Sequence, residues 1–451
     1  MSMRKFGIKV AVGLLAAAGV AIGGAQLLTA NRKADTAASV DIHDRRLVEA
    51  GAYIARTGDC VACHSVPNGK PFAGGLAMQT PVGTIYSSNI TPDKQAGIGN
   101  YSYADFKNAV QYGIRKDGTP LYPAMPYPSY AIMPDADVQA LYAYFMSQVE
   151  PVSQASAAST IPWPLNMRWP MAWWQQLFAG KRQFAAPAGA DEKLVRGAYL
   201  VEGPGHCGAC HTPRGLAYQE QALSMADGDA FLSGAVIDGW RAKSLRGEAQ
   251  GLQSWSAEDI GMFLKTGRTD KVAAFGAMAD VVEHSTRYFT DGDIASIAAY
   301  LKRLPAVNGK LAAFPPKTDS TTAALRDGRY DSRGAVIYME QCVVCHRADG
   351  QGMPRIFPAL AGNSAVYAQN PQSIIQITLE GGKMPANDTD AMAFAMPGFK
   401  HLSNRDVTDV INFIRTAWTN QAPVIGDNDV AQIRDFLASK KPNIVAGGNH
   451  E

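Results

Sequence analysis

The pentapeptide Cys-x-x-Cys-His occurs three times in this chain of 451 residues, at positions 60–64, 207–211 and 342–346, and it contains all six cysteines. Residues three apart lie on one face of a helical turn, so the two sulfurs of each copy reach the same edge of a flat macrocycle. The histidine that follows projects toward its centre. This pattern is typical of covalent haem attachment. The predicted thioether positions and iron ligands are Cys60, Cys63 and His64, then Cys207, Cys210 and His211, then Cys342, Cys345 and His346.

Two other uses of paired cysteines fit the sequence less well. A structural zinc ion takes four ligands, commonly from two Cys-x-x-Cys pairs that share one site. The copies in this chain begin at residues 60, 207 and 342, which is too far apart and too regular for that arrangement. A redox-active dithiol needs no histidine directly after its second cysteine, yet all three copies have one.

Each copy lies in a segment with the same order of helical patterns. A short helical pattern with a Gly-Ala pair precedes each motif, and a small residue there would let a second helix cross closely. The glycines of these pairs are Gly51, Gly197 and Gly334. An amphipathic helix with a polar start ends each segment. Its suitable N-caps are Asp135, Thr290 and Ser403.

These repeats determine the predicted fold. The length of the chain indicates about three domains, strand patterns are scarce, and two further helices are expected over residues 103–112 and 257–266. We predict an all-α protein of three tandem class I-like cytochrome c domains with an N-terminal apolar helix. The predicted divisions are a signal or anchor segment over 1–31, domains over 43–150, 191–304 and 332–440, a Trp-rich linker over 151–190 and a second linker over 305–331.

A second iron ligand for each haem must come from elsewhere in its segment. Met125, Met278 and Met396 each lie shortly before a terminal helix, where a loop that wraps over the haem edge would present a thioether. We predict these three as distal ligands. For Met278 the alternative is a core methionine with His284 as the ligand. Met384 also precedes a proline, but it lies further from its helix.

Ligation by His and Met has two consequences. It leaves no open position on the iron, which favours electron transfer over catalysis. A haem peroxidase, which needs a vacant position, is therefore disfavoured, and we expect no catalytic residue in this chain. The proximal rings also need an acceptor that fixes their orientation. Pro358 could offer its carbonyl to His346, and Pro213 could offer its own to His211.

The N-terminus predicts export across a membrane. Arg4, Lys5 and Lys9 precede an uncharged run over residues 10–31. The run has the length of a signal-peptide core or of a membrane-spanning helix, and the charges before it place the N-terminus in the cytoplasm. We expect an uncleaved anchor, with a signal peptide as the alternative. Either way the remaining chain lies on the periplasmic side.

A Trp-rich stretch over residues 163–182 contains four of the seven tryptophans. Trp, Leu and Phe flanked by Arg and Lys suit a membrane–water interface, whereas a hydrophobic clamp between two domains would have the same composition. Both interpretations stay open. The formal net charge of +2 is balanced, and no basic cluster is interleaved with aromatic residues, so nucleic acid is not an expected partner.

Longer stretches resemble one family. Residues 83–93, 122–127, 203–215 and 412–415 are similar to the triheme cytochrome c subunits of membrane-bound dehydrogenases of acetic acid bacteria and their relatives. The third segment is most like the alcohol and aldehyde dehydrogenase type. Further relatives occur in gluconate, sorbitol and fructose dehydrogenases.

The resemblance implies three covalent haems c, a separate catalytic subunit and, in some complexes, a small third subunit. The catalytic partner would be a quinoprotein, a molybdoprotein or a flavoprotein. The cytochrome would pass electrons to ubiquinone at the periplasmic face of the bacterial inner membrane. Ubiquinone is apolar, so we expect its site in the Trp-rich stretch, at Trp169, Trp173 and Trp174. The alternative function is a free-standing multihaem carrier that donates to a terminal oxidase.

Overall fold

The computed structural model describes residues 3–33, 39–307, 318–387, 389–390 and 392–439, without the side chains of residues 3–12, 14 and 15. The chain divides into two compact units. The first comprises residues 1–55, 63–185 and 216–219, and the second comprises residues 56–62, 186–215 and 220–451. The second and third Cys-x-x-Cys-His motifs lie in the second unit.

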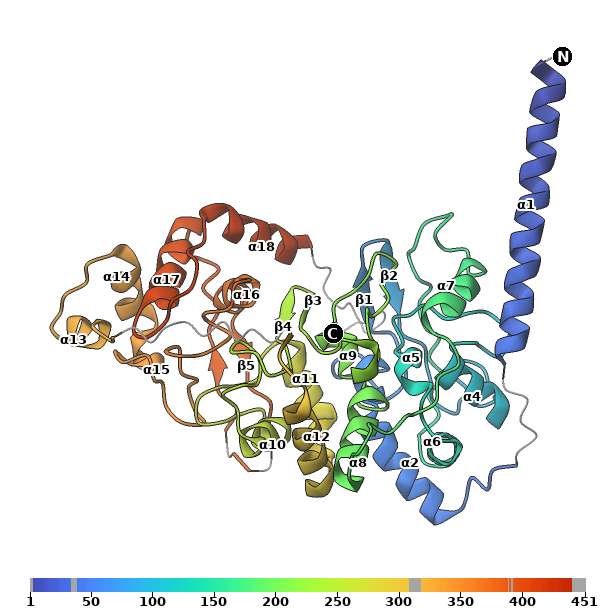
Figure 1. Cartoon of the computed structure of the whole chain (residues 1–451), viewed down its shortest axis with the longest axis horizontal. Helices are drawn as coiled ribbons and strands as arrows, with labels where there is room; N and C mark the ends of the chain where they lie inside the picture. Colours follow the sequence, from blue (N-terminus) through green and yellow to red (C-terminus); the bar gives the residue numbers. More distant parts are fainter. Residues whose placement is uncertain (1–2, 34–38, 308–317, 388, 391, 440–451) are drawn as a thin grey trace, which may run out of the picture. The chain divides into compact units, whose positions relative to one another are not determined.

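Helices dominate the described chain (Figure 1). They are α1 (Met3–Arg32), α2 (Arg45–Thr57), α3 (Cys60–Cys63), α4 (Tyr103–Tyr112), α5 (Tyr127–Tyr130), α6 (Asp135–Ser147), α7 (Pro170–Phe178), α8 (Glu192–Glu202), α9 (Gly208–His211), α10 (Ala257–Thr266), α11 (Ala277–His284), α12 (Asp291–Arg303), α13 (Thr321–Arg326), α14 (Arg333–Gln341), α15 (Val343–His346), α16 (Gln372–Glu380), α17 (Asn404–Thr416) and α18 (Asp427–Ser439). The short 3₁₀ helices η1 (Met225–Asp227) and η2 (Thr286–Tyr288) lie in the second unit.

The expected all-α class needs one refinement, because short strands in the described part of the chain form three two-stranded antiparallel sheets. Strand β1 (Ala77–Thr80) pairs with β2 (Gly83–Tyr86), β3 (Ala235–Ile237) with β4 (Trp240–Ala242), and β5 (Gly382–Lys383) with β6 (Ala395–Met396). Strands of two to four residues are too short for an alternating pattern to reveal them in the sequence.

The same close helix crossing occurs once beside each motif. A Cβ atom built on Gly51 in α2 would lie 1.9 Å from the carbonyl oxygen of Ala140 in α6. The corresponding distance is 2.1 Å from Gly197 in α8 to Ser296 in α12, and 2.1 Å from Gly334 in α14 to Asp409 in α17. Figure 1 shows α8 beside α12 and α14 beside α17. The obstructing atoms belong to backbone that cannot rotate away, so the predicted need for a small residue is confirmed.

The predicted N-caps are confirmed at two of three terminal helices. Thr290 Oγ1 accepts the backbone N–H of Asp293, and Ser403 Oγ accepts that of Asp406, both at 3.1 Å. The prediction for Asp135 is wrong, because α6 begins at this residue and Pro134 precedes it as the N-cap. The Asp135 carboxylate instead accepts hydrogen bonds from other side chains, including the hydroxyl of Tyr103 at 2.6 Å. The predicted bounds of α4 and α10 are both confirmed.

The N-terminal apolar run forms helix α1, and the C-terminal part of this helix packs against α7. A Cβ atom on Gly24 would lie 2.7 Å from the indole ring of Trp173, whose Nε1 donates to the carbonyl of Ala21 at 3.1 Å. Arg32 donates from Nε to the carbonyl of Tyr112 at 3.0 Å. Within the part of the chain that the structure describes, no helix is long and apolar enough to cross a membrane, so the expected span is not found there.

The glycine crossings give a stability prediction. Gly197→Ala inserts a methyl group 2.1 Å from a backbone oxygen, so we expect a loss of about 2 kcal/mol in the free energy of unfolding, as in other overpacked cores. Gly261→Ala, at a mid-helix position of α10, is the matched control. Its methyl group meets only a side-chain carbon of Ile294 at 3.1 Å, and the gain in helix propensity of up to about 1 kcal/mol offsets that contact. Equal melting temperatures for the two variants would contradict the close crossing.

Candidate functional site

Each motif histidine makes the same hydrogen bond. The Nδ1 atoms of His64, His211 and His346 lie 2.7, 2.7 and 3.0 Å from the backbone carbonyls of Ser88, Lys243 and Pro358. A nitrogen that faces a carbonyl must carry the ring proton, which leaves Nε2 free to bind a metal. All three rings are therefore held in the tautomer that a proximal iron ligand needs.

The predicted carbonyl acceptor of His346 is confirmed as Pro358, whereas Pro213 is the wrong acceptor for His211. The acceptor is Lys243, which directly follows strand β4. Strand β4 pairs with β3, and β3 is held beside the motif because the N–H of Gly234, just before β3, donates to the carbonyl of His211 at 2.7 Å. Ser88 has the equivalent place after β2 in the first unit.

The protonation states agree with iron ligation and disagree with thiol redox chemistry. Burial lowers the pKa of His64 and His346, and it lowers the pKa of His211 to about 4, so the rings are neutral near pH 7. Burial also raises the pKa of the Cys207 and Cys342 thiols to about 12. A redox-active dithiol needs a lowered thiol pKa, so these cysteines lack the property that defines that class.

The third motif opens into an apolar cavity in the second unit. Cys342, Cys345 and His346 line this cavity together with Met384 and Met396. The remaining wall is formed by aliphatic and aromatic residues that include Phe357, Ile374, Ile377, Phe394, Val410 and Ile414. Two thiols at one edge, an oriented imidazole and thioethers within one apolar cavity fit a covalently bound haem.

Two methionines compete for the distal position of this third site. The predicted ligand Met396 lies in β6, opposite Gly382 of β5. Met384 directly follows β5, is 9% exposed and donates its backbone N–H to the carbonyl of Phe394 at 3.0 Å. The pairing of β5 with β6 therefore brings Met384 to the same cavity, although its distance from α17 in the sequence argued against it. Met396 stays a prediction, with Met384 as its rival.

The other two predicted distal ligands lie in small apolar clusters. Met125 is packed against Tyr127 and Trp174 in the first unit. Met278 lies at the start of α11 and is packed with Phe263 against a cluster of Ala274, Ala279 and Val282. His284, the alternative ligand for the second site, ends the same helix. Both methionine assignments stay predictions.

Comparisons with known proteins place these motifs in a family. The cytochrome c family profile matches residues 48–148 and 332–418. The cytochrome c subunit of a quinone alcohol dehydrogenase from Gluconacetobacter polyoxogenes is 51% identical over 417 residues, which covers 90% of this chain and 88% of the relative. The chain belongs to the cytochrome c subunits of dehydrogenases.

Other members of this family have different named substrates. The gluconate 2-dehydrogenase cytochrome c subunit of Pantoea cypripedii is 50% identical over 395 residues, covering 86% of this chain and 89% of that protein. The fructose dehydrogenase cytochrome subunit of Gluconobacter japonicus is 35% identical over 413 residues, covering 86% and 83%. The family is thus one of electron-transfer subunits that serve several dehydrogenase complexes.

The three tryptophans predicted to bind quinone have different surroundings. Trp174 is buried, packs edge-on against Tyr127 with ring centroids 6.3 Å apart and donates to the carbonyl of Ala217 at 2.8 Å. Trp173 is 40% exposed beside α1, and Trp169 is half-buried directly before α7. Trp174 thus has a packing role within the first unit, whereas Trp173 offers part of its ring to the surface.

Substitution by histidine shows which of the two methionines of the third site, Met384 or Met396, is the iron ligand. Imidazole stabilises ferric iron better than a thioether does, so a histidine in place of the true ligand lowers the midpoint potential of one haem. We expect Met396→His to lower one midpoint potential in a spectroelectrochemical titration and Met384→His to change none. A lowered potential in Met384→His alone would make Met384 the ligand.

Proposed function

We propose that this chain carries three covalent haems c and passes electrons from a catalytic dehydrogenase subunit to ubiquinone. The observation that carries the proposal is the repeated hydrogen bond from the Nδ1 of each motif histidine to a backbone carbonyl. Three copies of one ligand-orienting arrangement, each beside a pair of cysteines, support three equivalent haem sites.

Each bound haem would supply one-electron exchange between ferrous and ferric iron. The residues of this chain attach the macrocycle, orient the proximal ring and exclude water from the third cavity. The predicted methionines would fill the distal positions, so that neither substrate nor dioxygen could bind iron. The chain would therefore carry electrons and leave substrate oxidation to its partner.

The partner is proposed from the relatives. Their names assign them to quinone alcohol, gluconate and fructose dehydrogenases, and the first two types are about equally similar to this chain. We propose an alcohol- or aldehyde-oxidising partner, because the third segment has the motifs of that type. The complex would act at the periplasmic face of the bacterial inner membrane, since haem attachment to Cys-x-x-Cys-His occurs on exported chains.

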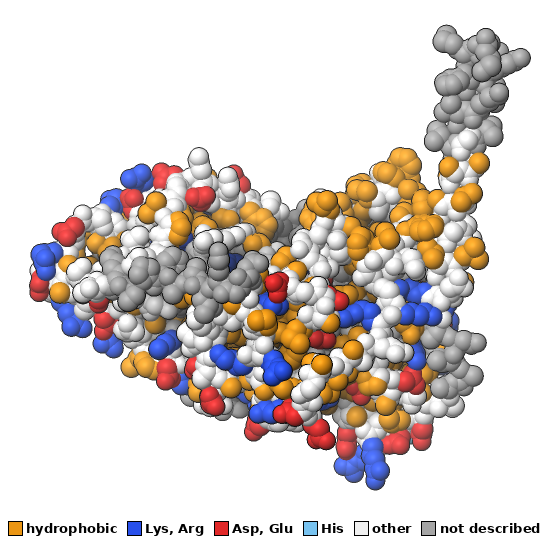
Figure 2. All heavy atoms as spheres, viewed as in Figure 1, with side chains coloured by type: hydrophobic (Ala, Val, Ile, Leu, Met, Phe, Trp, Pro, Cys, Tyr) orange, Lys and Arg blue, Asp and Glu red, His pale blue; other side chains and the backbone are white. Residues whose placement is uncertain are grey.

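We place the exit to ubiquinone at α7 in the first unit. The cluster of Tyr127 and Trp174 connects α7 to Met125, the predicted distal ligand of the first haem. Figure 2 shows hydrophobic side chains gathered over α7 and the adjoining part of α1. Exposed apolar side chains of α7 include Leu177 at 72% and Trp173 at 40%. An apolar quinone that docked here would lie close to the first haem.

The haem count tests the basis of the proposal. Thioether bonds survive acid-acetone extraction, whereas haem held only through its iron is removed. We expect the denatured, extracted full-length chain to retain about three haems in a pyridine haemochrome assay. A Cys207→Ser and Cys210→Ser double variant should retain one fewer. Fewer than three haems on the intact wild-type chain would contradict the proposal.

The exit site is tested at Trp173, because Trp174 is buried and its loss would disturb packing. We expect Trp173→Ala to slow ubiquinone reduction several-fold in membranes and to leave haem reduction by the partner's substrate fast. Trp173→Phe is the matched control, since it keeps an aromatic ring while it removes the donor to the Ala21 carbonyl and the outer part of the indole. Normal quinone reduction in Trp173→Ala would place the exit elsewhere.

A further inference from the structure

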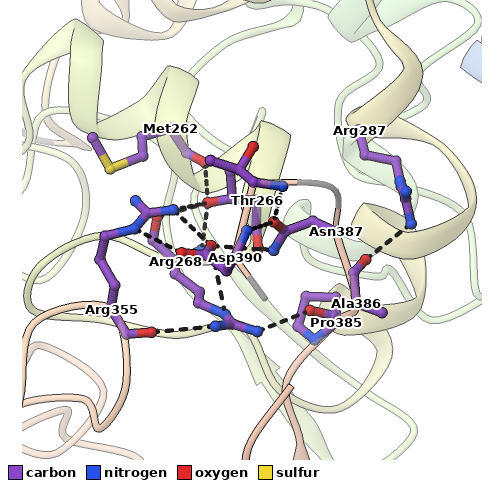
Figure 3. Close-up of polar contacts among 10 residues, drawn as sticks. Met262, Thr266, Arg268, Arg287, Arg355, Pro385, Ala386, Asn387 and Asp390 are labelled. Carbon is purple, nitrogen blue, oxygen red and sulfur yellow. Dashed lines mark hydrogen bonds and ion pairs between the residues drawn. The ribbon is translucent and has the colours of Figure 1, made fainter. Parts of the chain in front are cut away.

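Arg268 is a buried cation that joins two loops around the third site. It follows the C-cap Gly267 of α10, and only 1% of its surface is exposed. Its Nη1 donates to the carbonyl of Arg355 and its Nη2 to that of Pro385, both at 3.3 Å. Among the described residues its Nε has no hydrogen-bond partner, and this atom lies 4.0 Å from a carboxylate oxygen of Asp390 (Figure 3).

The carboxylate of Asp390 is already engaged by a second arginine. Arg355 donates from Nε at 2.9 Å and from Nη2 at 2.6 Å, which is a bidentate ion pair. Burial alone would raise the pKa of Asp390, but the hydrogen bonds from Arg355 outweigh it and lower that pKa, so the carboxylate is ionised. Among the described residues of this cluster, two guanidinium groups thus face one carboxylate, and one positive charge is left over.

This excess charge lies beside the third haem cavity. Arg268 and Arg355 border a narrow crevice together with Ile356, Pro358 and Met384, and the last three residues also line the haem cavity. Pro358 is the residue whose carbonyl orients His346. Pro385, one of the two acceptors of Arg268, directly follows Met384. Arg268 is therefore bonded to both loops that border the iron position.

Residues shortly before Met278, the predicted distal ligand of the second haem, also form part of this wall. Ala273, Ala274 and Phe275 line the haem cavity, and the carbonyl of Lys271 accepts the backbone N–H of Ala359 at 2.9 Å. The segment that carries Arg268 is thus held against the third site by backbone contacts as well. Because Arg268 is buried, its charge acts on the neighbouring cavity more strongly than it would in water.

We propose that Arg268, a residue of the second repeat, raises the midpoint potential of the third haem. A fixed positive charge near the iron favours the reduced state, which carries one positive charge fewer. Arg268 touches no reacting atom. It acts through the electric field of its charge and through its hydrogen bonds to the two loops, so it is a positioning residue. The inference rests on the proposed function in requiring a haem in the third cavity.

Two substitutions of opposite charge test this inference in the full-length, haem-loaded protein. Arg268→Gln removes the positive charge, and we expect it to lower the midpoint potential of the third haem in a spectroelectrochemical titration. Asp390→Asn removes the negative charge with little change of shape, and we expect it to raise the same potential. Mere loosening of the loops would move both variants in the same direction. Shifts of the same sign, or no shift in either variant, would overturn the proposal.

Two further variants keep the test decisive. Arg268→Lys retains the charge without the fork of donors, so it should restore most of the potential lost in Arg268→Gln, and failure to restore it would count against the charge effect. Arg287→Gln is the matched control, because Arg287 donates to the carbonyl of Ala386 in the same loop at 2.9 Å but is only half-buried. It should leave the potential unchanged, and a drop as large as that of Arg268→Gln would overturn the proposal.

The third haem is identified as the one whose potential moves in Met396→His or Met384→His. The haem count distinguishes a failure of the proposed function from a failure of the inference about Arg268. Three retained haems with unshifted potentials would refute only the role of Arg268. Fewer than three haems would refute the proposed function itself.

Discussion

The close approach of helix backbones at Gly51, Gly197 and Gly334 is the constraint on which the placement of each Cys-x-x-Cys-His motif depends. Each glycine lies in the last helix before a Cys-x-x-Cys-His turn, so the crossing limits where that turn can begin. The partner helices α6 and α12 come last in their repeats, whereas α17 of the third repeat is followed by α18. One contact therefore joins an early and a late helix of each repeat, and the chain between them contains the methionine that we predict as the distal ligand.

The sequence was sufficient for features that depend on local chemistry. The small residues at the three crossings, the caps at Thr290 and Ser403, and the bounds of α4 and α10 follow from residue size, from side-chain acceptors and from periodicity, which can be recognised within a few residues. The helix that crosses each glycine lies far along the chain and could not be identified in this way. The wrong N-cap prediction at Asp135 also concerns only neighbouring residues. Pro134 occupies the N-cap position. The Asp135 carboxylate accepts hydrogen bonds from side chains of α4, which no local sequence pattern predicts.

Features that depend on long-range pairing could not be read in this way. The carbonyl of Lys243 reaches His211 only because β3 pairs with β4, and Met384 reaches the third cavity only because β5 pairs with β6. Backbone carbonyls have no residue-type signature, so Ser88 and Lys243 were not identifiable as acceptors. Arg268 is a similar case, since nothing in its sequence neighbourhood indicates that it is buried against Asp390 of another repeat.

The wall formed by Ala273, Ala274 and Phe275 has a consequence for the modularity of this protein. The third repeat is not self-sufficient, because part of the enclosure around its cofactor belongs to the preceding repeat. A fragment that began after residue 331 would leave that side of its macrocycle open to water. Recombination between family members should therefore preserve the second and third repeats as a pair. A fusion point between them would separate the third cavity from the residues of the second repeat that line it.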